Sequence, residues 1–122
     1  MKREWSFNPA HLSAAVITLV VSFAPLTAAG ADADAAESLA RRESCLKCHG
    51  IDKSKDGPAY KEVAAKYKGK PGAEEHLIEH VKSGKSVQMR SGEWEDHRII
   101  KTRDEAAIRN LVQWILSLDS AP

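Results

Sequence analysis

The chain has 122 residues, with 18 lysine and arginine residues, 17 acidic residues and only two cysteines. This length fits one small domain, and a content of 43% hydrophobic and 29% charged residues excludes both a disordered chain and an integral membrane protein. The formal charge of +1 argues against nucleic acid as a partner, and two cysteines cannot form a multi-disulfide scaffold.

The first 31 residues have the order of a secretory signal peptide. A basic start at Lys2 and Arg3 is followed by a mostly apolar segment, residues 12–26, and then by small residues. The alternative is an uncleaved membrane anchor, but the apolar segment is shorter than the roughly 20 residues that span a bilayer. We therefore expect residues 1–31 to be a signal peptide that is removed, leaving residues 32–122 as a periplasmic domain with no membrane association.

Four helices are predicted in the mature chain, and strand signals are poor throughout. In chain order the helices cover residues 35–47, 59–67, 73–83 and 102–118. The third ends at Gly84, and the last begins with a capping box formed by Thr102 and Glu105. Residues 85–101 have no clear periodicity and are expected to form a long loop. The fold class predicted from these patterns is all-α.

The motif that carries chemistry lies at the end of the first predicted helix. It reads Cys45-Leu46-Lys47-Cys48-His49, and C-x-x-C-H is the attachment signature of c-type haem. Two thiols three positions apart can both reach the vinyl groups on one edge of a porphyrin and form thioether bonds. The adjacent histidine then lies under the iron as its proximal ligand. The motif predicts haem c, with Cys45 and Cys48 as its covalent anchors and His49 as an iron ligand.

Two other uses of these cysteines are weaker. A thioredoxin-like redox pair requires a βαβ context, which the predicted helices do not provide. A zinc site needs two further ligands, for which His76 and His80 are candidates. Both histidines are expected to face away from the apolar stripe of their helix, so we interpret His80 as a surface residue.

From the first helix to the C-terminus, the chain resembles the small bacterial class I cytochromes c, which contain one haem. The matching pieces are Cys45-Leu46-Lys47-Cys48-His49, Gly57-Pro58-Ala59-Tyr60, Val63-Ala64-Ala65-Lys66-Tyr67, Gly72-Ala73-Glu74 and Leu111-Val112-Gln113-Trp114-Ile115-Leu116-Ser117-Leu118. The resemblance implies four helices around one covalent haem, with the first and last helices crossing. It also implies that the Pro58 carbonyl accepts a hydrogen bond from the proximal imidazole. For Trp94, in the distal loop, two interpretations stay open: its indole N–H donates to a haem propionate, or it is a half-exposed loop residue.

The second axial ligand departs from the family pattern. Class I cytochromes usually supply a methionine, commonly followed by proline, but this chain has no Met-Pro pair. His97 lies 17 residues before Trp114, close to the position of the family's ligand methionine, whereas Met89 lies 25 residues before it. We therefore expect His97 to be the distal iron ligand, with Met89 as the alternative and an open iron as a third case.

The aromatic content of the mature chain is low for a domain of 91 residues. Residues 32–122 contain no phenylalanine, and their aromatic side chains are Tyr60, Tyr67, Trp94 and Trp114. A domain this small has little core of its own to stabilise it. We therefore expect haem to fill the core and the haem-free chain to be largely unfolded.

The function implied by the resemblance is electron transport by a monomeric carrier protein, not enzyme catalysis. Haem iron with two axial ligands would pass single electrons between redox partner proteins through transient docking. Two alternatives remain. A labile sixth ligand would make the chain a gas-binding or catalytic haem protein, and stable association would make it an electron-entry subunit of a larger oxidoreductase.

Overall fold

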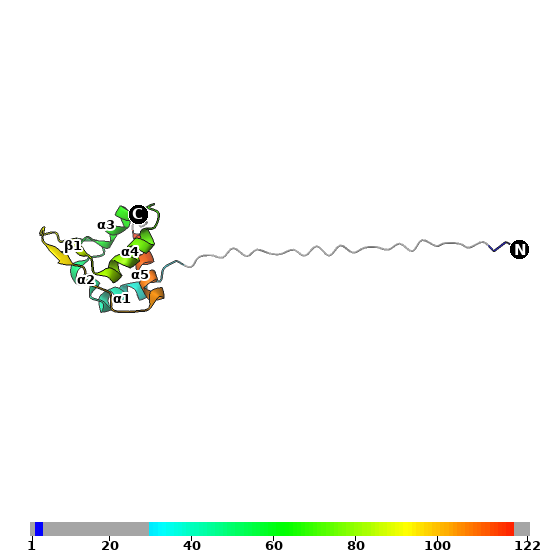
Figure 1. The fold of residues 1–122 in the computed structure, drawn as a ribbon, viewed down its shortest axis with the longest axis horizontal. Coiled ribbons are helices and arrows are strands. Elements are labelled where there is room, and N and C mark those ends of the chain that lie inside the picture. The colour runs from blue at the N-terminus through cyan, green and yellow to red at the C-terminus, as the bar shows by residue number, and fades with distance from the viewer. Residues whose placement is uncertain (1, 4–29, 119–122) are drawn as a thin grey trace.

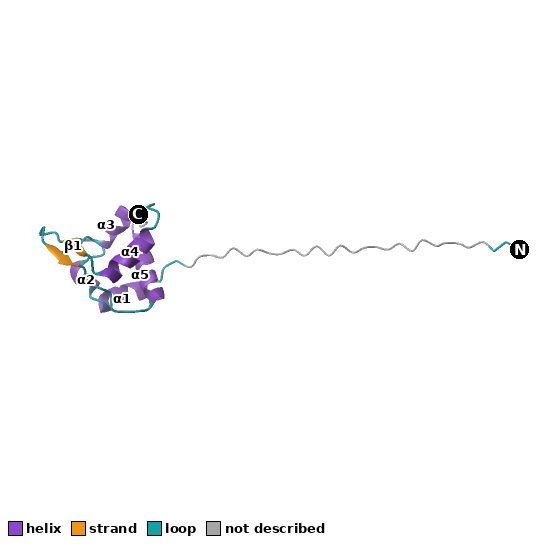
Figure 2. Ribbon diagram, viewed as in Figure 1, coloured by secondary structure: helices purple, strands orange, loops and turns teal. Residues whose placement is uncertain are grey.

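The computed structural model describes residues 2–3 and 30–118 of the chain. The predicted signal peptide, residues 1–31, therefore falls almost entirely outside the described residues. The elements are α1 (Ala33–Arg42), α2 (Cys45–Cys48), α3 (Tyr60–Tyr67), α4 (Ala73–Ser83), β1 (Ser86–Gln88), β2 (Trp94–Asp96) and α5 (Glu105–Ser117). The helices form one body, and the two strands extend from its edge (Figures 1 and 2). No helix in residues 2–3 and 30–118 is long and apolar enough to cross a bilayer.

The first predicted helix is divided in two. Ser44 has φ of +62°, a left-handed conformation that an α-helix of L-residues cannot continue through. Helix α1 therefore ends at Arg42, and the one-turn helix α2 begins at Cys45 on a new axis. Neither glycine nor proline marks this position, so the sequence pattern gave no sign of the break. The cysteine motif therefore lies on a separate helical turn and not on the last turn of α1.

The first and last long helices pack against each other, as the family resemblance implies. Helix α1 contributes Ala36 and Ala40, both fully buried, and α5 contributes Ile108 and Leu111. Small side chains let the two backbones approach closely, and the longer ones of α5 fill the contact. Asp32 adds a pair of hydrogen bonds with Asn110 on α5, at 2.8 and 2.9 Å. The start of α1 is thereby fixed to the middle of α5.

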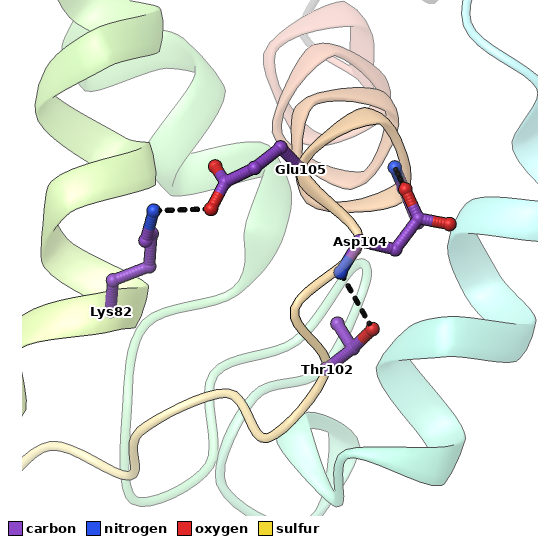
Figure 3. A network of polar contacts seen from close by, with 5 residues as sticks. Lys82, Thr102, Asp104 and Glu105 are labelled. Carbon is purple, nitrogen blue, oxygen red and sulfur yellow. Dashed lines mark hydrogen bonds and ion pairs between the residues drawn. The ribbon is translucent and has the colours of Figure 1, made fainter.

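The start of α5 differs from the predicted capping box. Its N-cap is Asp104, whose side chain accepts a hydrogen bond from the Ala107 N–H at 3.0 Å. Thr102 instead accepts from the Asp104 N–H at 3.2 Å (Figure 3). Glu105 forms an ion pair with Lys82 of α4 at 2.6 Å. Asp104 and not Thr102 is the N-cap, because Asp104 lies directly before the first residue of the helix. Glu105 does not take part in capping and instead links α5 to α4.

The segment that was expected to be a long loop contains a β-hairpin. Strands β1 and β2 are antiparallel, with Val87 opposite Glu95. Both strands are only three residues long and largely exposed, which is too short for an alternation of apolar and polar residues to be recognised in the sequence. Beyond the hairpin, the N–H of His97 donates to the Lys85 carbonyl at 3.0 Å, and that of Ile100 donates to the Val81 carbonyl at 2.9 Å. These bonds hold the segment containing His97 against the end of α4.

Candidate functional site

The two cysteines lie on the single turn of α2 and are both half-buried and unpaired. Residues three apart on a helix share a face, and both cysteines line one large cavity. The Lys55 ammonium donates to the Leu46 carbonyl within this turn at 2.6 Å. Burial raises the pKa of the Cys45 thiol above its ordinary value. The motif thus presents two thiols on one wall of the cavity.

His49 follows α2 and is held by its neighbours on the same wall. Its Nδ1–H donates to the Pro58 carbonyl at 2.7 Å. A carbonyl oxygen can only accept, so Nδ1 carries the ring proton and Nε2 keeps a free lone pair. The ring also stacks on Tyr60, with centroids 5.3 Å apart and planes 20° apart. Tyr60 in turn meets the edge of the Trp114 ring at 5.7 Å. Nε2 is therefore the nitrogen available to a metal, and the ring plane is fixed.

Gly57 is a site residue that sequence reasoning treated only as part of a turn. A Cβ atom at this position would lie 2.8 Å from Cε1 and 3.1 Å from Nδ1 of His49. The position therefore admits no side chain while His49 keeps its hydrogen bond to Pro58. The sequence signal was the pairing of Gly57 with Pro58 after C-x-x-C-H, but the spacing alone cannot show which ring the glycine faces.

Replacing Gly57 with alanine is expected to displace the His49 ring. Overpacking of this kind typically costs about 1–3 kcal/mol of folding free energy. Urea unfolding would measure that loss, and the electron paramagnetic resonance (EPR) spectrum of the oxidised haem-loaded protein would report the altered ligand. Gly69→Ala is the control, because Gly69, unlike Gly57, has a positive φ, and a side chain there would meet no neighbour within 4 Å, so the substitution strains the backbone without touching His49. It should lower stability without changing the spectrum, and an unchanged spectrum in Gly57→Ala would contradict the assignment.

His97 approaches His49 across the cavity. The ring centroids are 6.0 Å apart, and the planes are inclined at 46°. Imidazole nitrogens bind transition metals at about 2 Å, and the ring centroid lies roughly 1 Å further, so two imidazoles on opposite sides of one metal have centroids about 6 Å apart. Burial, reinforced by the neighbouring His49, lowers the pKa of His97. A neutral His97 ring at this distance suits the role of an iron ligand.

Met89, the alternative ligand, also lines the cavity. It lies in the turn of the hairpin, where its N–H donates to the Glu93 carbonyl at 2.7 Å. The structure therefore brings both candidates for the sixth ligand to the cavity.

His80 is half-buried and lines the cavity, so its interpretation as a surface residue is wrong. Its ring lies 4.3 Å from the His97 ring, centroid to centroid. Burial and the nearby histidines lower the pKa of His80 to about 4, so the ring is neutral near pH 7. The signal was available in the sequence, because His80 follows buried Leu77 by three residues and so lies on the same helix face.

Trp94 lies outside the group of cysteines and histidines that line the cavity. It is in strand β2, its side chain is 67% exposed, and it is not among the residues that line the cavity. The geometry gives no support to a hydrogen bond from its indole to a propionate. Among the described residues, no group of three or more His, Cys, Asp or Glu side chains is arranged to hold a metal ion, so the zinc alternative gains no support either.

The cavity has a volume of about 520 Å³, within the range of roughly 300–1,000 Å³ that is usual for cofactor sites. Apolar side chains form much of its wall, including Tyr67, Leu77, Val81, Leu111 and Ile115. No charged or polar residue is fully buried in the part of the chain that the structure describes. An apolar cavity with two thiols on one wall and two facing imidazoles fits a covalently attached haem.

Comparison with known proteins gives a consistent picture. The family model described as cytochrome c matches residues 33–119. Cytochrome c-551 of Pseudomonas aeruginosa is 39% identical over 95 residues, covering 75% of this chain and 85% of that protein. Cytochrome c-552 of Hydrogenobacter thermophilus is 33% identical over 103 residues, covering 84% and 95%. The crystal structure of the class 1 cytochrome MtoD from Sideroxydans lithotrophicus ES-1 is similar, with 54% identity, a TM-score of 0.72 and coverage of 74% and 99%.

Proposed function

The chain belongs to the cytochrome c family, and on that basis we propose that it carries single electrons between redox partner proteins in the periplasm. The cofactor of this family is covalently bound haem c with its iron, as the C-x-x-C-H motif predicts. The proposal depends chiefly on one observation. Two imidazoles, His49 and His97, face each other at 6.0 Å across the cavity that both cysteines line.

In this proposal Cys45 and Cys48 would hold the haem through thioether bonds, and His49 and His97 would bind its iron. When bound, the haem would supply one-electron redox chemistry. The contribution of the protein is to fix the positions of the two histidine ligands. The hydrogen bond from His49 to Pro58 fixes the proximal ring, and the backbone bond from His97 to Lys85 fixes the distal segment. Little needs to rearrange when one electron arrives or leaves.

The apolar wall has a second effect on electron transfer. Tyr67, Leu77, Leu111 and Ile115 line the cavity, and with haem in place their apolar side chains would leave little room for water beside it. Few water molecules then need to reorient when the charge of the iron changes, and the haem potential is set by the protein rather than by solvent. A water-poor site with fixed ligands favours outer-sphere electron transfer over substrate chemistry.

The periplasmic location is proposed from the predicted signal peptide and from the haem attachment motif, because c-type haem is attached outside the cytoplasm. The cavity is open at one side, so a haem edge would be accessible to partners. Docking at such an edge would be transient, with an interface below about 1,200 Å². The chain would act as a monomer.

Carbon monoxide distinguishes an electron carrier from a gas-binding or catalytic haem protein. If His49 and His97 both bind the reduced iron, adding CO to the dithionite-reduced protein should leave the Soret band unchanged on the time scale of mixing. A rapid shift of the band would instead indicate a labile sixth ligand and would refute the proposed function.

A further inference from the structure

One nitrogen of His97 is left without a partner. Among the residues that the structure describes, Nδ1 of His97 is the single buried side-chain nitrogen or oxygen atom with no hydrogen bond. Such an atom costs folding free energy, so its occurrence in a native protein calls for an explanation. Because Nδ1 is buried rather than open to the cavity, Nε2 is the nitrogen left to bind iron. Nδ1 would then carry the ring proton and need an acceptor.

The two proposed iron ligands, His49 and His97, differ in whether their Nδ1 atom has a hydrogen-bond partner. The proximal ring donates its Nδ1–H to the Pro58 carbonyl. Metal-binding histidines almost always donate their second N–H to a carboxylate, a carbonyl or water, which fixes the ring and strengthens it as a ligand. The backbone carbonyls at the end of α4 that lie beside the His97 segment already accept other bonds, Val81 from Ile100 and Lys85 from His97 itself. None of the neighbouring backbone carbonyls, including that of Arg98 beside the ring, accepts a hydrogen bond from Nδ1 in the structure.

His80 is the polar side chain in contact with the distal ring. The two ring centroids are 4.3 Å apart and the planes are inclined at 50°, so the rings are in van der Waals contact. A neutral imidazole has one nitrogen with a free lone pair. A rotation of the His80 ring about its Cβ–Cγ bond would turn that nitrogen toward Nδ1 of His97. His80 comes from α4 and His97 from the segment after β2, and the backbone bonds described above hold the two segments together.

We propose that His80 is a positioning residue that accepts a hydrogen bond from Nδ1–H of His97 and so orients the distal ligand. The inference rests on the proposed function, because it requires Nε2 of His97 to bind the iron. It makes the two sides of the site equivalent: Pro58 holds the proximal imidazole and His80 holds the distal one. An imidazole whose N–H is hydrogen-bonded to an acceptor donates more electron density from its other nitrogen to the iron. It therefore stabilises Fe(III), lowers the reduction potential and dissociates less often.

Substitutions at His80 test this role in the haem-loaded protein. His80→Leu removes the acceptor, and His80→Gln replaces it with an amide oxygen. In the Leu variant we expect CO to bind the reduced protein about 10-fold faster, in line with the 10- to 100-fold effect of losing such a partner, together with a higher potential and an altered EPR spectrum. The Gln variant should return all three readouts toward wild type. His76→Leu, one turn earlier on α4, is the matched control and should change none of them.

A direct observation is available if the Leu variant does not fold. In the reduced, diamagnetic wild-type protein labelled with ¹⁵N-histidine, NMR should show coupling across the hydrogen bond from His97 Nδ1 to a His80 nitrogen. Absence of this coupling would overturn the inference. So would a His80→Leu protein with a shifted potential but an unchanged CO rate, since His80 would then act on a group other than His97.

The wild-type absorption spectrum separates this inference from the function it rests on. If the oxidised protein has two imidazole ligands and the His80 variants behave as wild type, only the role of His80 is refuted. If the oxidised protein shows thioether ligation, the proposed role of His97 is refuted first, whatever the His80 variants do.

Discussion

Haem-free protein prepared from the Cys45→Ala/Cys48→Ala double variant is expected to be largely unfolded. Without thioether bonds, haem can be extracted, which leaves the cavity of about 520 Å³ open in the centre of the domain. Residual cavities cost about 24 cal/mol per Å³, so a cavity of this volume would cost up to about 12 kcal/mol. Proteins of this kind have a total stability of roughly 5–15 kcal/mol. The penalty is therefore comparable with the whole stability of the domain.

Collapse of the cavity would not recover this loss, because α1, α3 and α4 all pack on α5. Closing the cavity would separate these contacts. Far-ultraviolet circular dichroism and urea unfolding would measure the outcome. Adding haem to the same variant is the control, and we expect it to restore helix content through His49 and His97. A haem-free variant with a cooperative urea transition would contradict the prediction that haem forms the core.

Replacing His97 with methionine is expected to raise the reduction potential by on the order of 100 mV, because thioether sulfur favours Fe(II) more than imidazole does. The oxidised variant should gain the far-red charge-transfer band of thioether-ligated haem. His97→Ala should lose the low-spin signal of two imidazoles and, when reduced, bind CO rapidly. Spectroelectrochemistry and EPR would measure these changes.

Met89→Leu is the matched control for the His97 variants, because Met89 lines the same cavity from the hairpin turn. We expect its spectrum and potential to match those of the wild type. If Met89→Leu opens the iron to CO while His97→Ala leaves the spectrum unchanged, Met89 is the ligand and the proposed assignment is wrong.

The fold was largely predictable because local rules determine most of its elements. The apolar spacing of Leu77, Ile78 and Val81 and the stop at Gly84 located α4 at residues 73–83, where the structure has it. The break at Ser44 was not predictable, since serine is not a residue type that favours the left-handed conformation seen there. The hairpin was also missed, because exposed strands of three residues carry no hydrophobic pattern.

The residues of the candidate site likewise include some that the sequence predicts and some that it does not. Spacing was enough to single out Cys45, Cys48 and His49, since their chemistry requires them to be neighbours in the chain. The role of Gly57 could not be predicted, because it depends on which ring the turn approaches in space. The inward position of His80 could be read from its spacing to Leu77, but its contact with His97 could not, because His97 comes from a distant part of the chain. For Trp94 the sequence left two interpretations open, and its 67% exposed side chain favours that of an exposed residue of the hairpin.

The central claim is that two imidazoles, from His49 and His97, hold the haem iron. The absorption and EPR spectra of the oxidised wild-type protein test it most directly. We expect a low-spin, six-coordinate signal typical of two imidazole ligands and no far-red thioether band. A clear thioether band, or a high-spin signal from an open iron, would contradict the claim.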